Sequence, residues 1–358
     1  MKILKKILKA ILIVIAVLVL GFIGIILYAM ASEYKPHDKE LIAQPGNPSL
    51  LRDSLTLSFL TWNIGYAGLD KDMDFFKDGG TKVITPEKNC RENISMIEDF
   101  LLRNDTIDFI YIQEIDRDSK RSYRIDEYEN LSKNLPGYNP FFAKNYDVFF
   151  VPAPPSKPMG KVVSGITIFS KLTPESSTRY SYPGNIGFPT QLFYLRRCFM
   201  VNRYRIENGK ELVVINTHNE AFDEGGTIRK AQMERLREFV LNEYNAGNYV
   251  IVGGDWNQYP PDFKPAFTGN KGFTGQIGTF NLMGIESDYM PVEWEWIFDP
   301  TTPSVRTLLA AYDPATTPTS VCDMFLISPN IGSVFVKCHH LGFTNSDHNP
   351  VIIQVKLK

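Results

Sequence analysis

Groups that can bind a cation and move protons follow several short apolar runs of this sequence. They are carboxylates, amides and imidazoles, at Asn63, Gln113-Glu114, Asn216-Thr217-His218, Gly254-Asp255-Trp256-Asn257, Asp323 and Ser346-Asp347-His348. Oxygen donors of this kind, without paired thiolates, suit a hard cation such as Mg²⁺ or Mn²⁺. They also suit phosphoryl chemistry, in which the protein positions the reactants and stabilises charge on phosphate oxygens. Each short motif recurs by chance, so only the ordered set indicates this chemistry.

Local patterns add detail to two of these groups. Asp255 and Asn257 alternate along an extended segment, which predicts that both point to one face and that Trp256 is buried on the other. The preceding Gly253-Gly254 is compatible with a tight turn. Asp323 lies inside an apolar run, where a carboxylate is costly to bury without a partner.

Runs of β-branched and aromatic residues predict the strands that must position these groups. The runs are 57–62, 109–112, 165–169, 212–215, 249–252, 324–327 and 350–355. Helices are predicted near 85–103, with Pro86 at the start, and over 227–244. Because α/β scaffolds assemble their sites where strands feed loops, we expect one α/β domain over 55–358, after a proline-containing linker over 33–54.

The first 32 residues form a separate segment that resembles a membrane anchor. No charged side chain occurs from Ala10 to Ser32, and as a helix this stretch reaches about 35 Å, enough for a hydrocarbon core of ~30 Å. The lysines before it place the N-terminus in the cytoplasm and the remainder outside the inner membrane. A single-pass anchor fits this length better than a signal peptide. Ala29-Met30-Ala31 nevertheless fits a cleavage site, and cleavage after Ala31 would give a secreted protein.

The composition excludes several other classes of protein. The chain of 358 residues carries 38 Lys and Arg against 40 Asp and Glu, and its N-terminal lysines leave the soluble part acidic. No broad basic field is present to hold nucleic acid non-specifically. Hydrophobic residues make up 44%, which excludes disorder for most of the length. The four scattered cysteines exclude a disulfide-rich miniprotein and a CxxC-type zinc module.

The ordered set of polar motifs resembles the endonuclease/exonuclease/phosphatase superfamily, which includes DNase I-like nucleases, abasic-site endonucleases, inositol-polyphosphate phosphatases and neutral sphingomyelinases. The resemblance covers about residues 55–357, and every signature motif is filled. It implies a four-layer α/β sandwich, with two packed mixed β-sheets flanked by helices, here preceded by one N-terminal transmembrane helix. It also implies a divalent cofactor, Mg²⁺ or Mn²⁺, and in-line attack of water on a phosphate ester.

The resemblance implies roles for the residues that would hold the cation and the water. Glu114 corresponds to the principal metal ligand, with Asn63 and Asp347 beside it. For Asn63 the alternative is an ordinary turn residue after a strand. Asp255 corresponds to the residue that orients or deprotonates the attacking water, and Asn257 to a partner of a phosphate oxygen.

The resemblance also implies roles for two histidines and one acid. His348 corresponds to a general acid or base, and histidine can exchange a proton at working pH because it titrates near neutrality. Asp323 corresponds to the acceptor that holds the His348 tautomer. His218 corresponds to a histidine that donates to the phosphate or protonates the leaving oxygen. Abasic-site endonucleases typically lack this histidine, which argues against that branch.

The substrate is indicated only by weaker signals. Arg229 and Gln232, at the start of a predicted helix, resemble the sphingomyelinase-like branch, although a solvated helix face is the alternative, and Arg306 is a further candidate for phosphate contact. The membrane tether and the acidic domain favour a phospholipid or sphingolipid headgroup. The alternatives are an extracytoplasmic nuclease acting on DNA or RNA, and an inactive binding module, which the filled motifs disfavour. No protein partner is predicted.

Three other segments carry expectations. The acidic loop 72–80 is expected to overhang the site, and the aromatic run 292–298 to form an ordinary half-buried strand rather than one that touches a membrane. If 328–333 formed a hairpin turn, Cys322 and Cys338 would lie opposite each other. A disulfide would then be possible, although two reduced, buried thiols are favoured.

Overall fold

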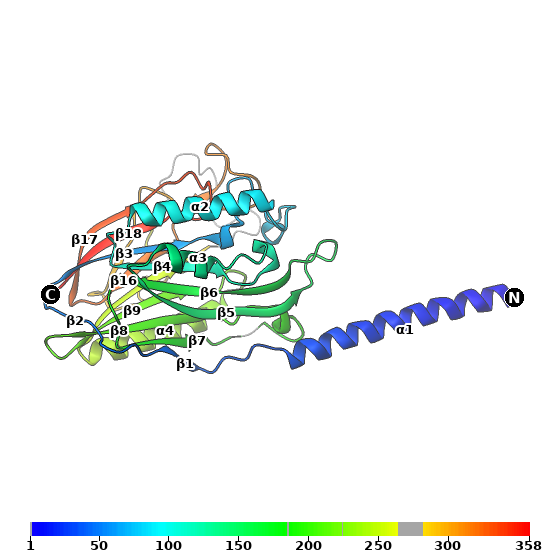
Figure 1. Cartoon of the computed structure of the whole chain (residues 1–358), viewed down its shortest axis with the longest axis horizontal. Coiled ribbons are helices and arrows are strands. Elements are labelled where there is room, and N and C mark those ends of the chain that lie inside the picture. Colours follow the sequence, from blue (N-terminus) through cyan, green and yellow to red (C-terminus); the bar gives the residue numbers. More distant parts are fainter. Residues whose placement is uncertain (1, 185, 224, 264–281) are drawn as a thin grey trace.

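The computed structural model describes residues 2–184, 186–223, 225–263 and 282–358. Two mixed β-sheets pack face to face with helices on their outer sides, which is the four-layer α/β sandwich that the sequence predicts. The long helix α1 (Lys2–Ala31) extends from one end of this domain (Figure 1). Its length and composition fit a membrane span or a signal sequence, and none of its most apolar window is buried.

The first sheet contains the strands that lead to Asn63 and Glu114. Its order is β17 (Ile331–Cys338), β18 (Val351–Leu357), β3 (Thr56–Asn63), β4 (Phe109–Asp116), β6 (Gly160–Ser170) and β5 (Asn139–Val151). β3 and β4 run parallel, whereas the other neighbours are antiparallel. The C-terminal ends of β3 and β4 therefore lie at the same edge of the sheet.

The second sheet contains the strands that lead to His218 and Asp255. Its order is β1 (Lys39–Ala43), β7 (Ser176–Ser181), β8 (Cys198–Ile206), β9 (Glu211–His218), β10 (Tyr249–Asp255), β16 (Asp323–Ile327) and β13 (Glu295–Ile297), with β2 (Leu50–Leu51) paired to β8. β9 and β10 run parallel. Two short pairs stand apart, β11 (Gln258–Tyr259) with β12 (Met283–Gly284), and β14 (Val305–Arg306) with β15 (Thr319–Ser320).

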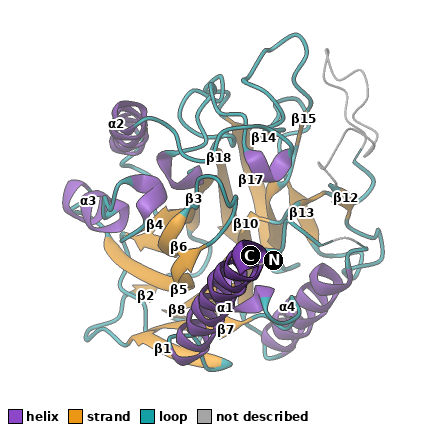
Figure 2. Cartoon of the chain, turned by 90° about the vertical axis from the view of Figure 1, so that its right-hand side faces the viewer, coloured by secondary structure: helices purple, strands orange, loops and turns teal. Residues whose placement is uncertain are grey.

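Amphipathic helices form the outer layers (Figure 2). α2 (Glu87–Arg103) repeats apolar residues at helical spacing, and Ile94, Ile97 and Leu101 pack on the six-stranded sheet together with α3 (Glu127–Asn134). α4 (Thr227–Asn245) covers the eight-stranded sheet through Leu236 and Val240. Short 3₁₀ turns complete the fold: η1 (Gly65–Ala67), η2 (Phe76–Asp78), η3 (Lys120–Ser122) and η4 (Thr190–Phe193).

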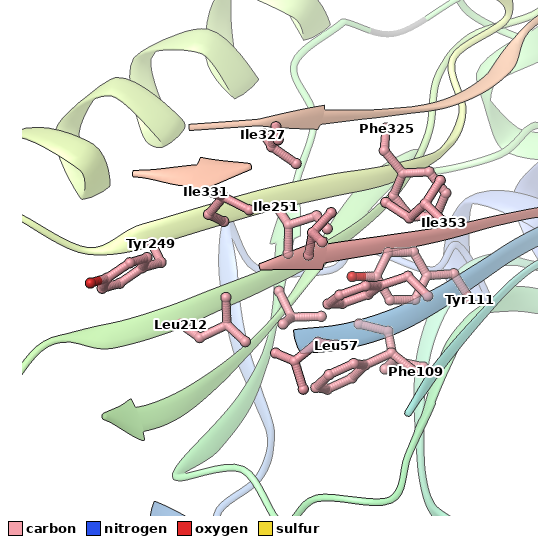
Figure 3. Packing of buried hydrophobic residues seen from close by; sticks show 14 of the residues in the cluster. Leu57, Phe109, Tyr111, Leu212, Tyr249, Ile251, Phe325, Ile327, Ile331 and Ile353 are labelled. Atoms are coloured by element: carbon pink, nitrogen blue, oxygen red, sulfur yellow. The ribbon is translucent and has the colours of Figure 1, made fainter. Parts of the chain in front are cut away.

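Aromatic and branched side chains fill the space between the two sheets (Figure 3). Phe59 and Phe109 stack with ring centres 4.6 Å apart, and Phe325 of the opposite sheet meets Phe59 edge-on. Burying one such side chain stabilises a fold by about 1.5–3 kcal/mol. This core fixes the two sheets relative to each other, and with them the strand ends that carry the polar groups.

The predicted elements are present, with one exception near the N-terminus. Each predicted strand lies within or overlaps an observed one, and both predicted helices form. The segment 33–54, however, is not only a linker, because β1 pairs with β7 and β2 pairs with β8. Prolines flank the stretch 39–43 without interrupting it, and a short strand at the edge of a sheet tolerates such neighbours.

The hypothetical hairpin between Cys322 and Cys338 does not form. The chain passes from β16 in one sheet to β17 in the other, because β16 already has β10 and β13 as its neighbours. Both thiols are free and buried, so the disulfide is absent and the reduced pair is confirmed. The aromatic run 292–298 contributes β13, an edge strand whose Trp296 packs edge-on against the buried Trp256, as expected of a half-buried strand.

Candidate active site

Four strand ends bring the predicted polar groups to one edge of the sandwich. The pairing of β3 with β4 places Asn63 beside Gln113, and the pairing of β9 with β10 places His218 beside Asp255. Asp323, the first residue of β16, lies opposite Asp255 across the antiparallel pair. Residues from distant parts of the chain therefore converge because the strands that carry them end together.

A buried amide network joins the two sheets at this edge. Gln113 Nε2 donates to Asn216 Oδ1 at 2.7 Å, and Asn216 Nδ2 donates to the backbone carbonyls of Ile112 and Thr167. Leaving one such buried group without a partner costs about 1–3 kcal/mol. The network therefore fixes the spacing between the two halves of the site.

Glu114 reaches the cavity through a β-bulge. The register between β4 and β6 shifts between Ile112 and Ile115, and Glu114 has a φ of 52°. A non-glycine residue in this left-handed conformation costs about 1–3 kcal/mol and is commonest at functional sites. In a regular strand, consecutive side chains point to opposite faces. The bulge lets Gln113 face the second sheet while Glu114 lines the cavity.

Two glycines allow β10 to pack closely beneath the site. A Cβ atom on Gly254 would lie 2.0 Å from the Thr217 carbonyl oxygen, and one on Gly253 would lie 2.3 Å from the ring of Phe325. Gly254 also has a φ of 146°, which L side chains rarely adopt. The pair is therefore part of a strand and not the tight turn that the sequence allowed, and it keeps β10 close to β9 beside Asp255.

Asp255 lies at the centre of the acidic group. Asn63 Nδ2 donates to Asp255 Oδ2 at 3.0 Å and to Glu114 Oε1 at 3.4 Å. His218 Nε2 lies 3.4 Å from the same Asp255 oxygen and 3.9 Å from Glu114 Oε1. These four side chains line one cavity of about 130 Å³.

Three further predicted residues line the same cavity. His348 Nε2 lies 3.8 Å from Asp255 Oδ2 and 4.0 Å from Asp347 Oδ2. Asn257 has a φ of 50° and is therefore not in the extended alternation that the sequence suggested. Its N–H donates to Asp255 Oδ1 at 2.9 Å, and its Nδ2 donates to the Asn219 carbonyl at 3.0 Å. This turn still leaves Asn257 on the cavity wall.

His348 is held from behind by Asp323. Its Nδ1 lies 2.8 Å from Asp323 Oδ2, which is the hydrogen bond that the resemblance implies. The same carboxylate oxygen accepts a hydrogen bond from Ser304 Oγ at 2.7 Å. Asp323 is fully buried, so the pair fixes the orientation of the ring and leaves Nε2 directed to the acidic group.

One cluster of potential metal ligands in the described chain is better suited to proton transfer than to binding a metal ion. Asp255, Cys322, Asp323 and His348 offer atoms within 4.8 Å of one another. Burial raises the pKa of the Cys322 thiol well above its usual value, and nearby carboxylates raise it further, so the thiolate that binds metals is absent. Asp323 is already engaged by His348 and Ser304.

The surroundings of the cavity shift the pKa values of Asp255, His348 and His218 in different directions. Burial opposes the charge on Asp255, but His348 and His218 outweigh it, so its pKa lies below the usual value and the carboxylate is ionised. Burial likewise opposes the charge on His348, but Asp323 and Asp255 raise its pKa well above the usual value. Burial, reinforced by Arg197, lowers the pKa of His218 well below its usual value. The proton is therefore held more strongly on His348 than on His218.

The remaining acids fit a hard divalent cation. Burial raises the pKa of Asp347 to about 7, and the charge of Glu114 acts in the same direction. Glu114, Asp347 and Asp255 thus place carboxylates around one cavity, with the amide of Asn63 between two of them. Carboxylate and amide oxygens are the ligands that Mg²⁺ and Mn²⁺ prefer, and a cation would relieve the repulsion among these acids.

Arg229 and Gln232, which were predicted to contact the substrate, form hydrogen bonds with the backbone. Arg229 donates to the carbonyls of Glu220, Asn257 and Asp223, and Gln232 accepts from the Glu220 N–H. Both are buried, and neither lies on the cavity wall. The solvated helix face is therefore wrong, and Arg229 positions the loop that bears Asn257 through the Asn257 carbonyl. Contact of either residue with the substrate stays a prediction.

Phosphate contact by Arg306 stays a prediction, and its buried Nε has no hydrogen-bond partner among the described residues. Arg306 lines the cavity, yet its guanidinium donates to the carbonyls of Asp70, Met73, Thr307 and Ala310. Its side chain is almost fully buried. It fixes the start of the loop 72–80, whose Phe75, Lys77 and Asp78 do overhang the cavity as expected.

Sequence reasoning missed several basic and aromatic residues on the cavity wall. They are Tyr66, Arg121 and Arg197. Arg121 is fixed by Asp116 and covers the Tyr66 ring, with its guanidinium 3.6 Å from the ring centre. No motif marks these positions, because a lysine or arginine in a loop looks the same in a sequence whether it faces solvent or a cavity.

The sandwich and the acid–imidazole group at its edge define the class of DNase I-like phosphoesterases and nucleases. The chain belongs to the Endonuclease/Exonuclease/phosphatase family, whose sequence profile matches residues 60–348. Members of this family are metal-dependent phosphoesterases and nucleases. No curated protein matches the sequence significantly.

Solved structures share the fold at low sequence identity. An endonuclease/exonuclease/phosphatase from Bacteroides vulgatus is 14% identical with a TM-score of 0.52, and the match covers 85% of this chain and 100% of that one. ANGEL2, a 2′,3′-cyclic phosphatase, is 13% identical with a TM-score of 0.52 over 90% and 99% of the two chains. The human Nocturnin catalytic domain is 15% identical with a TM-score of 0.49 over 88% and 100%.

Proposed function

We propose that this chain is a membrane-anchored phosphohydrolase that uses a divalent cation to hydrolyse the phosphate ester of a phospholipid or sphingolipid headgroup. The observation that carries the reaction is the meeting of Asp255 with two imidazoles on one cavity wall. Asp255 Oδ2 lies 3.4 Å from His218 Nε2 and 3.8 Å from His348 Nε2. One base and one acid around a single cavity are what hydrolysis of an ester requires.

Each of these residues has a proposed part in the reaction. Asp255, ionised at neutral pH, accepts a proton from the attacking water and orients it. His348 places positive charge and a proton at Nε2, where charge develops on the phosphate oxygens. His218 donates a hydrogen bond to the phosphate. Asn257 sets the position of Asp255 through its N–H.

Glu114, Asp347 and Asn63 are proposed to hold the cation, Mg²⁺ or Mn²⁺. When bound there, the cation would polarise a phosphate oxygen and neutralise part of the developing charge. Without it, the cavity presents Glu114 and Asp255 to an anionic substrate, and their charge repels phosphate. The negative charges of these acids must therefore be neutralised before the anionic ester can enter the cavity.

The lipid substrate is supported by the place where α1 ends. Tyr28, near the end of the helix, meets Phe149 of β5 edge-on, with ring centres 4.6 Å apart. Two residues beyond the helix, the chain is fixed by an ion pair between Glu33 and Arg196, next to the cavity-lining Arg197. α1 therefore leaves the domain beside the cavity, on the end of the molecule that Figure 2 faces.

An anchor at that position would hold the cavity close to the bilayer surface. Phe188 is 62% exposed in the loop before η4, and Phe222 on the cavity wall is 42% exposed. Exposed aromatic rings suit the boundary between headgroups and acyl chains. The lysines before the span support a cytoplasmic N-terminus and a catalytic domain outside.

The full chain in mixed micelles would test this proposal. With Mg²⁺, we expect it to release phosphorylated headgroup from a phospholipid or from sphingomyelin, and EDTA should abolish the release. Duplex DNA and single-stranded RNA serve as the competing substrates. Turnover that resists EDTA would contradict the cation, and turnover confined to nucleic acid would contradict the lipid headgroup.

A further inference from the structure

Arg197 is almost fully buried on the cavity wall, yet it is incompletely bonded. Its side chain is 5% exposed, and within the described residues its Nε and Nη1 have no hydrogen-bond partner. The nearest acid is Glu220, with 3.6 Å between Arg197 Nε and Glu220 Oε2. The other Glu220 oxygen already accepts bonds from the Tyr194 hydroxyl and from the N–H groups of Ala221 and Phe222. A ligand with acceptor oxygens would supply the hydrogen-bond partners that these buried donors lack.

Lys77 brings a second cation to the same cavity. Its Nζ lies 5.7 Å from the centre of the Tyr194 ring and 5.4 Å from that of Phe222. Among the residues that the structure describes, no carboxylate forms an ion pair with it. Burial lowers the pKa of Lys77, and the charges of Arg121 and Arg197 lower it further, whereas those of Glu220 and Glu114 raise it. An anion between Lys77 and Arg197 would offset that repulsion.

We propose that Lys77 and Arg197 form an anion subsite for a negatively charged group that the substrate carries in addition to the ester under attack. The inference rests on the proposed function and specifies the headgroup. A guanidinium with two uncommitted donor atoms and a nearby ammonium match the oxygens of a phosphate monoester. Both side chains line the cavity that also holds Asp255 and His348, so one substrate can reach both places.

The subsite also excludes a competing kind of headgroup. Quaternary ammonium groups bind to the faces of aromatic rings. Here the Lys77 ammonium already occupies the ring faces of Tyr194 and Phe222, and its charge repels a second cation. The cavity therefore favours an anionic headgroup, such as a phosphorylated inositol, over choline.

Binding of inorganic sulfate to the full chain in detergent tests the subsite without turnover. The titration is made by calorimetry in EDTA, because the carboxylates of Glu114 and Asp255, without a cation, then repel sulfate from the other part of the cavity. We expect sulfate binding to weaken about tenfold or more in Lys77→Gln and in Arg197→Gln. Arg205→Gln, which removes an arginine paired with Glu175 on the outer part of β8, should bind like wild type.

Lys77→Gln is the decisive variant, because it disturbs no buried ion pair. Unchanged sulfate affinity in Lys77→Gln would overturn the subsite even if Arg197→Gln failed to fold. Arg197→Lys should recover part of the affinity, since it restores the charge without the planar donors.

Hydrolysis in Mg²⁺ then separates this inference from the proposed function. Vesicles containing phosphatidylinositol or phosphatidylinositol 4-phosphate differ by one phosphate. We expect wild type to favour the phosphorylated lipid in kcat/KM and Lys77→Gln to lose that preference through KM. An equal loss on both lipids would overturn the second-anion role. The protein could instead bind sulfate in a Lys77-dependent way and hydrolyse neither lipid. That result would support the subsite and contradict the proposed hydrolase function.

Discussion

The acidic and the basic parts of the cavity wall differ in how their polar groups are satisfied. Asp255 is contacted by Asn63, Asn257 and two histidines, and Asp323 Oδ2 behind them is held by His348 and Ser304, although His218 Nδ1 and Asp323 Oδ1 have no hydrogen-bond partner among the described residues. Arg197 leaves two donor atoms without partners among the described residues, and no carboxylate there forms an ion pair with Lys77, whose ammonium lies over two aromatic rings.

The difference follows from where the two parts are built. The acids and histidines stand at the ends of β3, β4, β9 and β10, at the start of β16 and in the segment just before β18, where the sheets fix them before any ligand arrives. Lys77 lies in η2 and Arg197 directly precedes β8. Groups fixed in advance are what the chemical step needs, whereas unsatisfied groups on a cavity wall suit recognition of a ligand. Substitutions on the two parts should therefore fail in different ways.

The largest effect is expected for Glu114→Gln. The change keeps the shape of the side chain but removes the charge that the bulge of β4 directs into the cavity. We expect turnover to fall about 1000-fold on every substrate, because a cation ligand serves the phosphate that all of them share. Glu238→Gln, an exposed change on α4, is the matched control. A loss of turnover that varied strongly with the headgroup would contradict the distinction between the acidic and the basic parts of the cavity wall.

Asp323→Asn should have a smaller and pH-dependent effect. Burial disfavours the charged form of His348, but Asp323 raises its pKa and keeps the proton on the ring to higher pH. Without that charge the proton leaves at lower pH, so the alkaline limb of the kcat/KM profile should move to lower pH. Loss of such a supporting group typically costs 10–100-fold in activity, roughly the size expected here. An alkaline limb that stays in place would contradict the pairing.

Gly254→Ala tests how the acidic part is positioned. Its Cβ would lie 2.0 Å from the Thr217 carbonyl, at a φ of 146°. We expect a loss of about 3 kcal/mol in the free energy of unfolding, measured from the urea midpoint. Gly137→Ala, where no atom lies within 4 Å of the new Cβ, should change little. Equal stability of the two variants would contradict the tight contact between β9 and β10.

Much of this site could be predicted because the residues that mark the end of a strand are adjacent in the sequence. Apolar runs followed by polar clusters gave the positions of Glu114, His218, Asp255 and His348 on one edge, and the order of the motifs gave the fold. Burial of Asp323 required a partner, and the structure places His348 there.

The remainder depends on contacts between distant segments. Arg229 and Arg306 were expected to contact phosphate, but an arginine serves backbone carbonyls equally well, and the fold decides which lie nearby. Lys77 and Arg197 line the same cavity because the loop 72–80 folds over it. Likewise, Cys322 and Cys338 are symmetric about a turn in the sequence, yet the chain changes sheets between them.

The most direct test is to count tightly bound Mn²⁺ by electron paramagnetic resonance in the full chain in detergent. The account predicts binding in wild type that Glu114→Gln greatly weakens and that Cys322→Ala leaves intact. Binding that survives Glu114→Gln but disappears in Cys322→Ala would move the cation to the group around Asp323, and would contradict the division between cation-holding acids and the His348 pair.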